Sequence, residues 1–216
     1  MKIFTYWRSL ATFRVRMALN LKNLKAEEIE VDLSAGHQMK PEFAAINPMK
    51  AIPVFIDDDG TTLHQSLPIM EYLDERYPDP ALMPRDPAGR ARVRALAQMT
   101  VADSHPLVVP RVRADLASRF GATPEQVTRW AQTWLIAGLD AYETTLKRDK
   151  ETGDFCHGNA ITIADICLVS HAAGTRFFEG TIDGHPTVKR IVERCLADER
   201  IARAHPLRQP GAPKSV

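Results

Sequence analysis

Two stretches of the sequence hold groups that could bind a small peptide. Ile52-Pro53 precedes the apolar run Val54–Ile56, and a proline there gives no N–H to a sheet, so the backbone of Ile52 is available to a ligand. An Ile-Pro bond also adopts the cis form at modest cost, which would turn this backbone outward. Gln65-Ser66 opens a periodic helix, whose N-terminus attracts a carboxylate. These residues predict a peptide site, although an ordinary hairpin followed by a Ser-capped helix also accounts for them.

A third stretch, from Tyr6 to Arg16, leaves a predicted strand and enters a predicted helix. The N-terminus of a helix carries roughly half a positive charge and therefore stabilises a thiolate held there. A hydroxyl such as that of Ser9 would add a charge-assisted hydrogen bond, and related surroundings lower a thiol pKa by roughly 1–5 units. Ser9 or Thr12 could equally serve only as a helix cap. Both interpretations stay open.

The elements that must position these groups follow in the order β-α-β-α-β-β-α. Their predicted ranges are a strand at 2–6, a helix from Phe13 to Leu21, a strand at 25–33, a short helix at 41–46, a hairpin of 54–56 and 61–63, and a helix from Gln65 to Tyr77. This is the order of a thioredoxin-like domain. We therefore predict an α+β domain over residues 1–80.

The rest of the chain predicts a second, all-helical domain over residues 88–216. Four prolines among residues 77–87 indicate a linker before it. The prolines of His105-Pro106 and Pro110 predict a kink within one long helix. Further helices are predicted at 124–146, 162–178 and 186–196, and the pair Thr162 and Asp165 resembles a capping box with a structural role.

Composition limits the classes of function. Of 216 residues, 44% are apolar, and 28 basic side chains nearly balance 27 acidic ones, so neither a nucleic acid nor a membrane is an expected partner. The three cysteines have no metal or redox spacing, which predicts buried or idle thiols, no metal site and a reducing compartment. We expect a cytoplasmic protein, since no signal peptide or membrane-spanning run is present in the sequence.

The motifs together resemble a known family. Ile52-Pro53 with Gln65-Ser66 resembles the glutathione site of the glutathione transferases, and the run Arg8-Ser9-x-x-x-Phe13-Arg14-Val15-Arg16 is similar to the signature of their zeta class. That class includes the maleylacetoacetate and maleylpyruvate isomerases. Three more motifs match it: Asn47-Pro48-Met49-Lys50, His64-Gln65-Ser66 and His205-Pro206-x-Arg208-Gln209-Pro210. The resemblance covers essentially the whole chain and implies the glutathione transferase fold.

The resemblance also implies an activity and a set of site residues. The implied reaction is the glutathione-dependent cis–trans isomerisation of a maleyl keto-acid, with glutathione as cofactor, a small dicarboxylate-like substrate and a homodimeric enzyme. Ser9 would be catalytic. The implied glutathione-binding residues are Gln38, Ile52, Pro53, Gln65, Ser66 and His105. The implied substrate-binding residues are Arg8, Arg111 and Arg176, because arginine suits carboxylates.

Some positions depart from the zeta pattern. Leu10 and Ala11 stand where the class usually has a second hydroxyl or glycine and a cysteine or threonine, and Val108 and Val109 stand where it has asparagine. These changes make the expected pocket more apolar and favour a first alternative, a general transferase or peroxidase acting on small electrophiles. A second alternative is a non-catalytic glutathione-binding homologue.

Overall fold

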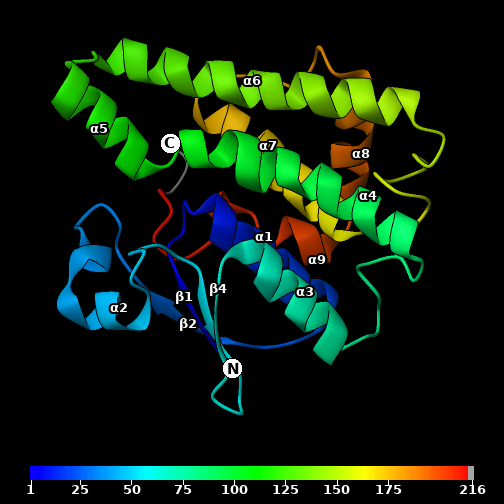
Figure 1. Ribbon diagram of the computed structural model, residues 1–216, viewed down its shortest axis with the longest axis horizontal. Coiled ribbons are helices and arrows are strands. Elements are labelled where there is room, and N and C mark those ends of the chain that lie inside the picture. Colours follow the sequence, from blue (N-terminus) through cyan, green and yellow to red (C-terminus); the bar gives the residue numbers. More distant parts are fainter. Residues whose placement is uncertain (214–216) are drawn as a thin grey trace. The chain divides into compact units, whose positions relative to one another are not determined.

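A computed structural model describes residues 1–213, which form two compact units (Figure 1). Unit 1 is Met1–Leu82 together with the segment that begins at Asp198, and unit 2 is Met83–Ala197. The domain limits expected from the sequence, 1–80 and 88–216, stay a prediction. No helix among the described residues is long and apolar enough to cross a membrane.

Unit 1 is built on a four-stranded mixed sheet in the order β2-β1-β3-β4. β1 pairs in parallel with β2, whereas β3 is antiparallel to both β1 and β4. The strands are β1 (Lys2–Thr5), β2 (Glu27–Glu30), β3 (Val54–Ile56) and β4 (Thr62–His64), and the helices are α1 (Leu10–Leu21), α2 (Pro41–Ile46) and α3 (Ser66–Arg76). A 3₁₀ turn, His37–Met39, precedes α2. The predicted βαβαββα order is confirmed.

Alternating residues of the strands bury the two faces of this sheet against different helices. Phe4 and Val54 belong to a cluster with Phe43 of α2, and the rings of Phe4 and Phe43 meet edge to face at 5.8 Å. Phe55, the next residue in β3, is fully buried on the other face, and its ring lies 6.3 Å from that of Tyr72 in α3. This period of two is the pattern of a strand with both faces covered.

The first helix begins three residues before the predicted start at Phe13. Ser9 has extended backbone angles and its side chain accepts a hydrogen bond from the backbone N–H of Thr12. This cap satisfies one of the otherwise unpaired N–H groups of the first turn, so Leu10 already lies in the helix. The predicted helix start at Phe13 is therefore wrong.

A buried lysine ties the start of the proline-rich segment to α1 and α3 within unit 1. The ammonium of Lys22, just after α1, lies 2.8 Å from the Asp74 carboxylate and donates to the carbonyls of Tyr77 and Pro80, both at 2.7 Å. Asp74 also accepts from the Leu82 N–H at 2.6 Å. One buried ion pair with several hydrogen bonds thus holds the segment up to Leu82 against the sheet's helices.

Unit 2 is helical, and its central helix is α7 (Ile163–Phe177), which is buried over most of its length. Around it lie α4 (Pro87–Gln98), α6 (Pro124–Arg148) and α8 (Pro186–Leu196), while α5 (Pro110–Phe120) contacts α6. The predicted capping box is confirmed: Asp165 accepts from the N–H and the hydroxyl of Thr162, each at 2.8 Å. Asp165 also accepts from the Cys156 N–H, which supports its structural role.

The predicted single kinked helix around Pro106 is wrong. α4 continues into a π-helical turn, Met99–Ser104, and a 3₁₀ turn, His105–Leu107, and then Val109 in extended conformation separates these from α5. Pro110 occupies the first position of α5, where its missing N–H costs nothing, so it starts a new helix.

The segment after Asp198 returns to unit 1. It contains α9 (Glu199–Ala202) and a 3₁₀ turn, Pro206–Arg208. Asn20 of α1 donates to the Arg200 carbonyl at 2.9 Å, and the His205 ring meets the Phe13 ring edge to face at 5.7 Å. This segment therefore covers part of α1.

Replacing Lys22 with methionine should destabilise unit 1. The change leaves the Asp74 carboxylate and two carbonyls without their buried cation, and breaking such a pair costs about 3–5 kcal/mol. Urea unfolding should show a lower midpoint for Lys22→Met. The exposed Lys25 provides the matched control, Lys25→Met, and equal midpoints for the two variants would contradict the structural role of Lys22.

Candidate active site

The strand register brings the predicted site residues of unit 1 to one end of the sheet. Phe4 pairs with Val54, and Val54 pairs with His64, so the chain after β1, before β3 and after β4 lies at the same end. β2 is parallel to β1, and its continuation toward the 3₁₀ turn leaves at that end as well. This end therefore carries five predicted positions or pairs: Arg8, Ser9, Gln38, Ile52-Pro53 and Gln65-Ser66.

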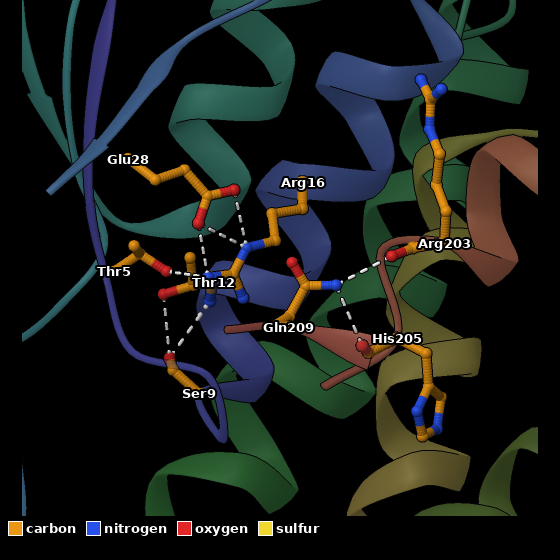
Figure 2. A network of polar contacts seen from close by, with 8 residues as sticks. All are labelled: Thr5, Ser9, Thr12, Arg16, Glu28, Arg203, His205 and Gln209. Carbon is orange, nitrogen blue, oxygen red and sulfur yellow. Dashed lines mark hydrogen bonds and ion pairs between the residues drawn. The ribbon is translucent and has the colours of Figure 1, made fainter. Parts of the chain in front are cut away.

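Ser9 caps α1 with a hydroxyl that retains its own proton. Its Oγ accepts from the backbone N–H of Thr12 at 3.2 Å and from the Thr12 hydroxyl at 3.0 Å (Figure 2). A hydroxyl has two acceptor sites and one donor, so these two bonds leave the Ser9 proton available to a ligand. The capping role and the predicted donor role are therefore compatible.

Arg16 anchors the same helix to the sheet. Its guanidinium forms an ion pair with Glu28 at 2.6 Å and also donates to the Thr5 hydroxyl (Figure 2). Arg16 is buried and lies two turns after Ser9. Its two-point contact with Glu28 holds the helix, and with it the Ser9 hydroxyl, in a fixed place.

The peptide bond between Ile52 and Pro53 is cis, in line with the expectation from the sequence. Among the described residues, neither the N–H nor the C=O of Ile52 takes part in a hydrogen bond. Asn47 holds the preceding loop, because its side chain donates to the Ala51 carbonyl at 2.6 Å and accepts from the Met49 N–H at 3.0 Å. The geometry leaves a short backbone edge that can pair with an extended ligand.

Gln65 and Ser66 form the N-terminus of α3. Gln65 has φ of 71°, a conformation uncommon for a residue other than glycine, and its side chain makes no capping bond. The N–H groups of Ser66 and Leu67 lie in the first turn, while Pro68 has none to offer. The uncapped first turn and the Ser66 hydroxyl together make a position suited to a carboxylate.

Gln38 and Arg8 complete the unit 1 set. Gln38 lies in the 3₁₀ turn before α2, and its amide oxygen is buried without a hydrogen-bond partner among the described residues. A buried amide oxygen without a partner costs free energy, which a ligand donor would recover. Arg8 is exposed directly before the cap.

The other three predicted residues lie in unit 2. His105 opens the 3₁₀ turn after the π-helical turn, Arg111 lies in the first turn of α5, and Arg176 lies in the last turn of α7. Both arginines are exposed, whereas His105 is half-buried.

The π-helical turn before His105 is held by a buried hydroxyl pair. The Tyr142 hydroxyl donates to the Leu96 carbonyl at 2.6 Å and lies 2.9 Å from the Thr100 hydroxyl, and the Ser104 hydroxyl donates to the Met99 carbonyl at 2.8 Å. A π turn adds a residue to the helix and so rotates the residues after it about the helix axis. These bonds therefore decide which way His105 leaves the helix.

Comparison with known proteins covers nearly the whole chain. A family model for the glutathione S-transferase N-terminal domain matches residues 8–76, and one for the glutathione S-transferase C-terminal domain matches residues 114–203. A maleylpyruvate isomerase from Ralstonia sp. is 38% identical over 97% of this chain and 99% of that protein. This chain belongs to the glutathione S-transferase family.

Solved structures refine the relationship. Maleylacetoacetate isomerase from Methylobacterium extorquens AM1, crystallised with malonate and GSH, is 48% identical with a TM-score of 0.97, over 99% of this chain and 100% of that one. A bacterial maleylpyruvate isomerase, described as a zeta-class glutathione S-transferase, is 37% identical with a TM-score of 0.94 over the same shares of the two chains. The predicted zeta-class resemblance and the predicted fold are confirmed.

Two positioning residues of this transferase were not predicted from the sequence. Thr12 was expected only as an alternative cap, yet its hydroxyl and N–H both bind the Ser9 side chain. Asn47 was only part of a motif, although it holds the loop before the cis proline. The local signal for Thr12 is a Ser-x-x-Thr pair at the start of a helix. The local signal for Asn47 is an asparagine whose side chain can accept from the N–H two residues later in a turn.

The three thiols of the transferase are not candidates for chemistry. Cys156, Cys167 and Cys195 are all buried, which confirms that part of the prediction. Burial, with a further contribution from Asp165, raises the pKa of the Cys156 thiol well above its usual value, so this thiol stays protonated. Residues 1–213 contain no group of three or more acidic, histidine or cysteine side chains that could hold a metal ion.

A methyl group at Gly138 should disturb the support of His105. A Cβ there would lie 2.5 Å from Ser104 Oγ and 2.6 Å from His171 Cε1, both of which are fixed by hydrogen bonds. We expect Gly138→Ala to destabilise the protein by about 1–3 kcal/mol, measured by thermal unfolding. At Gly184 a Cβ would meet nothing within 4 Å, so Gly184→Ala is the control, and a Gly138→Ala protein as stable as this control would refute the close contact.

Proposed function

We propose that this transferase catalyses the glutathione-dependent cis–trans isomerisation of a maleyl keto-acid, maleylacetoacetate or maleylpyruvate, to its fumaryl isomer. The observation that carries the proposal is the Ser9 hydroxyl, which caps α1 and keeps a proton to donate. Relatives of this chain over nearly its full length bear the names of these two isomerases, which supports the same reaction here.

The residues present fit glutathione. The N–H and C=O of Ile52, which no other described residue binds, suit the backbone of its cysteinyl residue. The first turn of α3 with Ser66 suits its γ-glutamyl carboxylate. Gln38 offers a buried amide oxygen that lacks a partner, and we assign it to the same ligand together with Gln65. The family resemblance implies the same ligand for His105.

The chain would activate glutathione through Ser9 and α1. When bound, glutathione supplies a thiolate for reversible addition to the double bond, so that the bond can rotate before the thiolate leaves. Ser9 would donate a hydrogen bond from its hydroxyl to the sulfur, and the positive end of α1 would add to the stabilisation of the negative charge. Arg16 and Thr12 hold this donor in place without touching the reacting atoms.

The arginines would bind the substrate. A maleyl keto-acid carries carboxylates, and the planar guanidinium binds a carboxylate with two parallel hydrogen bonds. We assign this role to Arg8, Arg111 and Arg176, which would also stabilise negative charge that develops on the substrate. All three are exposed, in agreement with a role toward a small ligand.

The first alternative, a general transferase or peroxidase for small electrophiles, loses part of its support. Val108 is 3% exposed and packs with Ala131 and Leu135 inside unit 2, so its apolar side chain belongs to the core. Leu10 is likewise buried. Ala11 and Val109 remain as half-buried apolar substitutions in favour of this alternative. The non-catalytic alternative would require that Ser9 fail to lower the thiol pKa.

The proposal includes a cytoplasmic homodimer. Three buried thiols that form no disulfide among the described residues fit a reducing compartment. The dimer rests on the family resemblance.

Removing the Ser9 hydroxyl should raise the thiol pKa of bound glutathione. Loss of one hydrogen bond to a charged group is worth about 1–2 pKa units, so the ultraviolet absorbance of the thiolate should titrate at higher pH in Ser9→Ala. Glutathione-dependent loss of maleylpyruvate should slow in parallel at neutral pH and recover as the pH rises. Glycine is nearly as good a cap as serine, so Ser9→Gly separates loss of the hydroxyl from loss of helix stability. Full activity in both variants would exclude the thiolate role.

Removing an arginine should separate the isomerase from a general transferase. Arg111→Gln or Arg176→Gln should lower kcat/KM for maleylpyruvate by roughly 10- to 100-fold, which is the loss of one charge-assisted contact. Conjugation of a neutral electrophile by the same variants should change little. Arg129, an exposed residue of α6, provides the control Arg129→Gln. Efficient conjugation in the wild type, with isomerisation that is slow or is unchanged in both arginine variants, would favour the first alternative.

A further inference from the structure

We propose that Arg113 is a positioning residue that clamps the first turn of α5 onto the end of α7. The clamp would set the spacing between Arg111 and Arg176, and through it the selectivity for a substrate with two carboxylates. The effect on substrate selectivity rests on the proposed function, whereas the contact that holds α5 does not.

α5 lacks a buried apolar face. None of its eleven side chains is buried, and Phe120 at its end is 78% exposed. Helices in folded proteins gain most of their stability from a packed apolar face. A helix without such a face depends on the few contacts that its partly buried residues make.

Arg113 makes two contacts that bridge different elements of unit 2. Its Nε donates to the Val108 carbonyl at 3.0 Å, in the segment before α5. Its guanidinium carbon lies 5.2 Å from the centre of the Phe178 ring, directly after α7. A guanidinium at this distance from an aromatic ring is attracted by the electrons of its face.

Hydrogen bonds from α6 hold Phe178 and Leu107, the residue before Val108. The Phe178 carbonyl accepts from Gln132 of α6 at 2.8 Å, and the Leu107 carbonyl accepts from Trp130 at 2.8 Å. Phe178 and Leu107 both pack against the buried cluster of Val108, Ala131 and Leu135. Arg113 therefore joins α5, which has no buried side chain, to residues that pack against this buried cluster.

The clamp lies beside both arginines of the proposed site. Arg111 precedes Arg113 by two residues in α5, and Arg176 precedes Phe178 by two residues at the end of α7. A shift of α5 away from Phe178 would change the distance between the two guanidinium groups. A small substrate with two carboxylates needs a fixed distance between its binding groups, so such a shift should weaken its binding more than that of glutathione.

A plain electrostatic role for Arg113 is the competing explanation. A third positive charge near Arg111 and Arg176 would attract an anionic substrate without any clamp. Lysine keeps the charge but cannot stack as a planar group, and Phe178 carries no charge. Changes at these two positions therefore separate the two explanations.

The experiment compares single and double variants of the pair. We expect Arg113→Met and Phe178→Leu each to raise KM for maleylpyruvate by roughly 3- to 30-fold, the worth of a cation–π contact, with KM for glutathione unchanged. The double variant should be no worse than Arg113→Met alone, because Arg113→Met already removes the contact with Phe178. Phe178→Tyr, which keeps the ring, should restore binding. Arg119→Met is the matched control, since Arg119 is an exposed arginine of the same helix that pairs with Asp115, one turn before it.

Two kinetic results would overturn the clamp. One is an Arg113→Met protein that behaves like Arg119→Met. The other is a pair of results: wild-type KM for maleylpyruvate in Arg113→Lys, and wild-type KM in Phe178→Leu. Together they would show that only the positive charge of residue 113 matters.

Hydrogen–deuterium exchange of the free protein tests the clamp without any substrate. Amides of residues 110–120 should exchange faster in Arg113→Met and in Phe178→Leu, but not in Arg119→Met. Unchanged exchange would refute the clamp whatever the activity. If exchange is faster in these two variants and the wild-type protein has no isomerase activity, the clamp is supported and the proposed function is refuted.

Discussion

The antiparallel pairing of β1 with β3 is the constraint on which the proposed glutathione site depends. Because Phe4 faces Val54 in this pair, the chain that leaves β1 toward Ser9 and the chain that enters β3 through Ile52 meet at one end of the sheet. Pro53 has no N–H and ends the ladder there, and no other described residue pairs with the Ile52 backbone. A register shift of one residue would move every side chain of the strand to the opposite face and separate these groups.

The Ser9 hydroxyl shows how one side chain can serve both stability and chemistry. Capping uses lone pairs, whereas stabilisation of a thiolate uses the proton. The two interpretations of Ser9 left open by the sequence are therefore both satisfied by the same atom. The support of this atom extends inward through Thr12 to Arg16, whose ion pair with Glu28 joins α1 to β2.

Unit 2 positions its residues by interrupting helices. The π-helical turn, held by Tyr142, redirects the chain at His105, and Pro110 then starts α5 with Arg111 in its first turn. The proposed site residues of unit 2 lie at helix ends, while apolar residues such as Val108 pack against Ala131 and Leu135 of α6. Small changes in these interruptions would move the arginines without disturbing the buried helix α7.

The sequence alone determined the order of the elements, the hairpin, the capping box of α7 and the chemical types of the candidate site residues. These features depend on hydrophobic period, proline and capping signals within a few residues, which are visible locally. The sequence did not determine the start of α1 at Leu10, the break between α4 and α5, the burial of Val108 or the contact between Arg113 and Phe178. Most of these depend on residues far apart in the chain, such as Tyr142 with Leu96. Only the tertiary structure could decide them, because long-range packing outweighs local preference there.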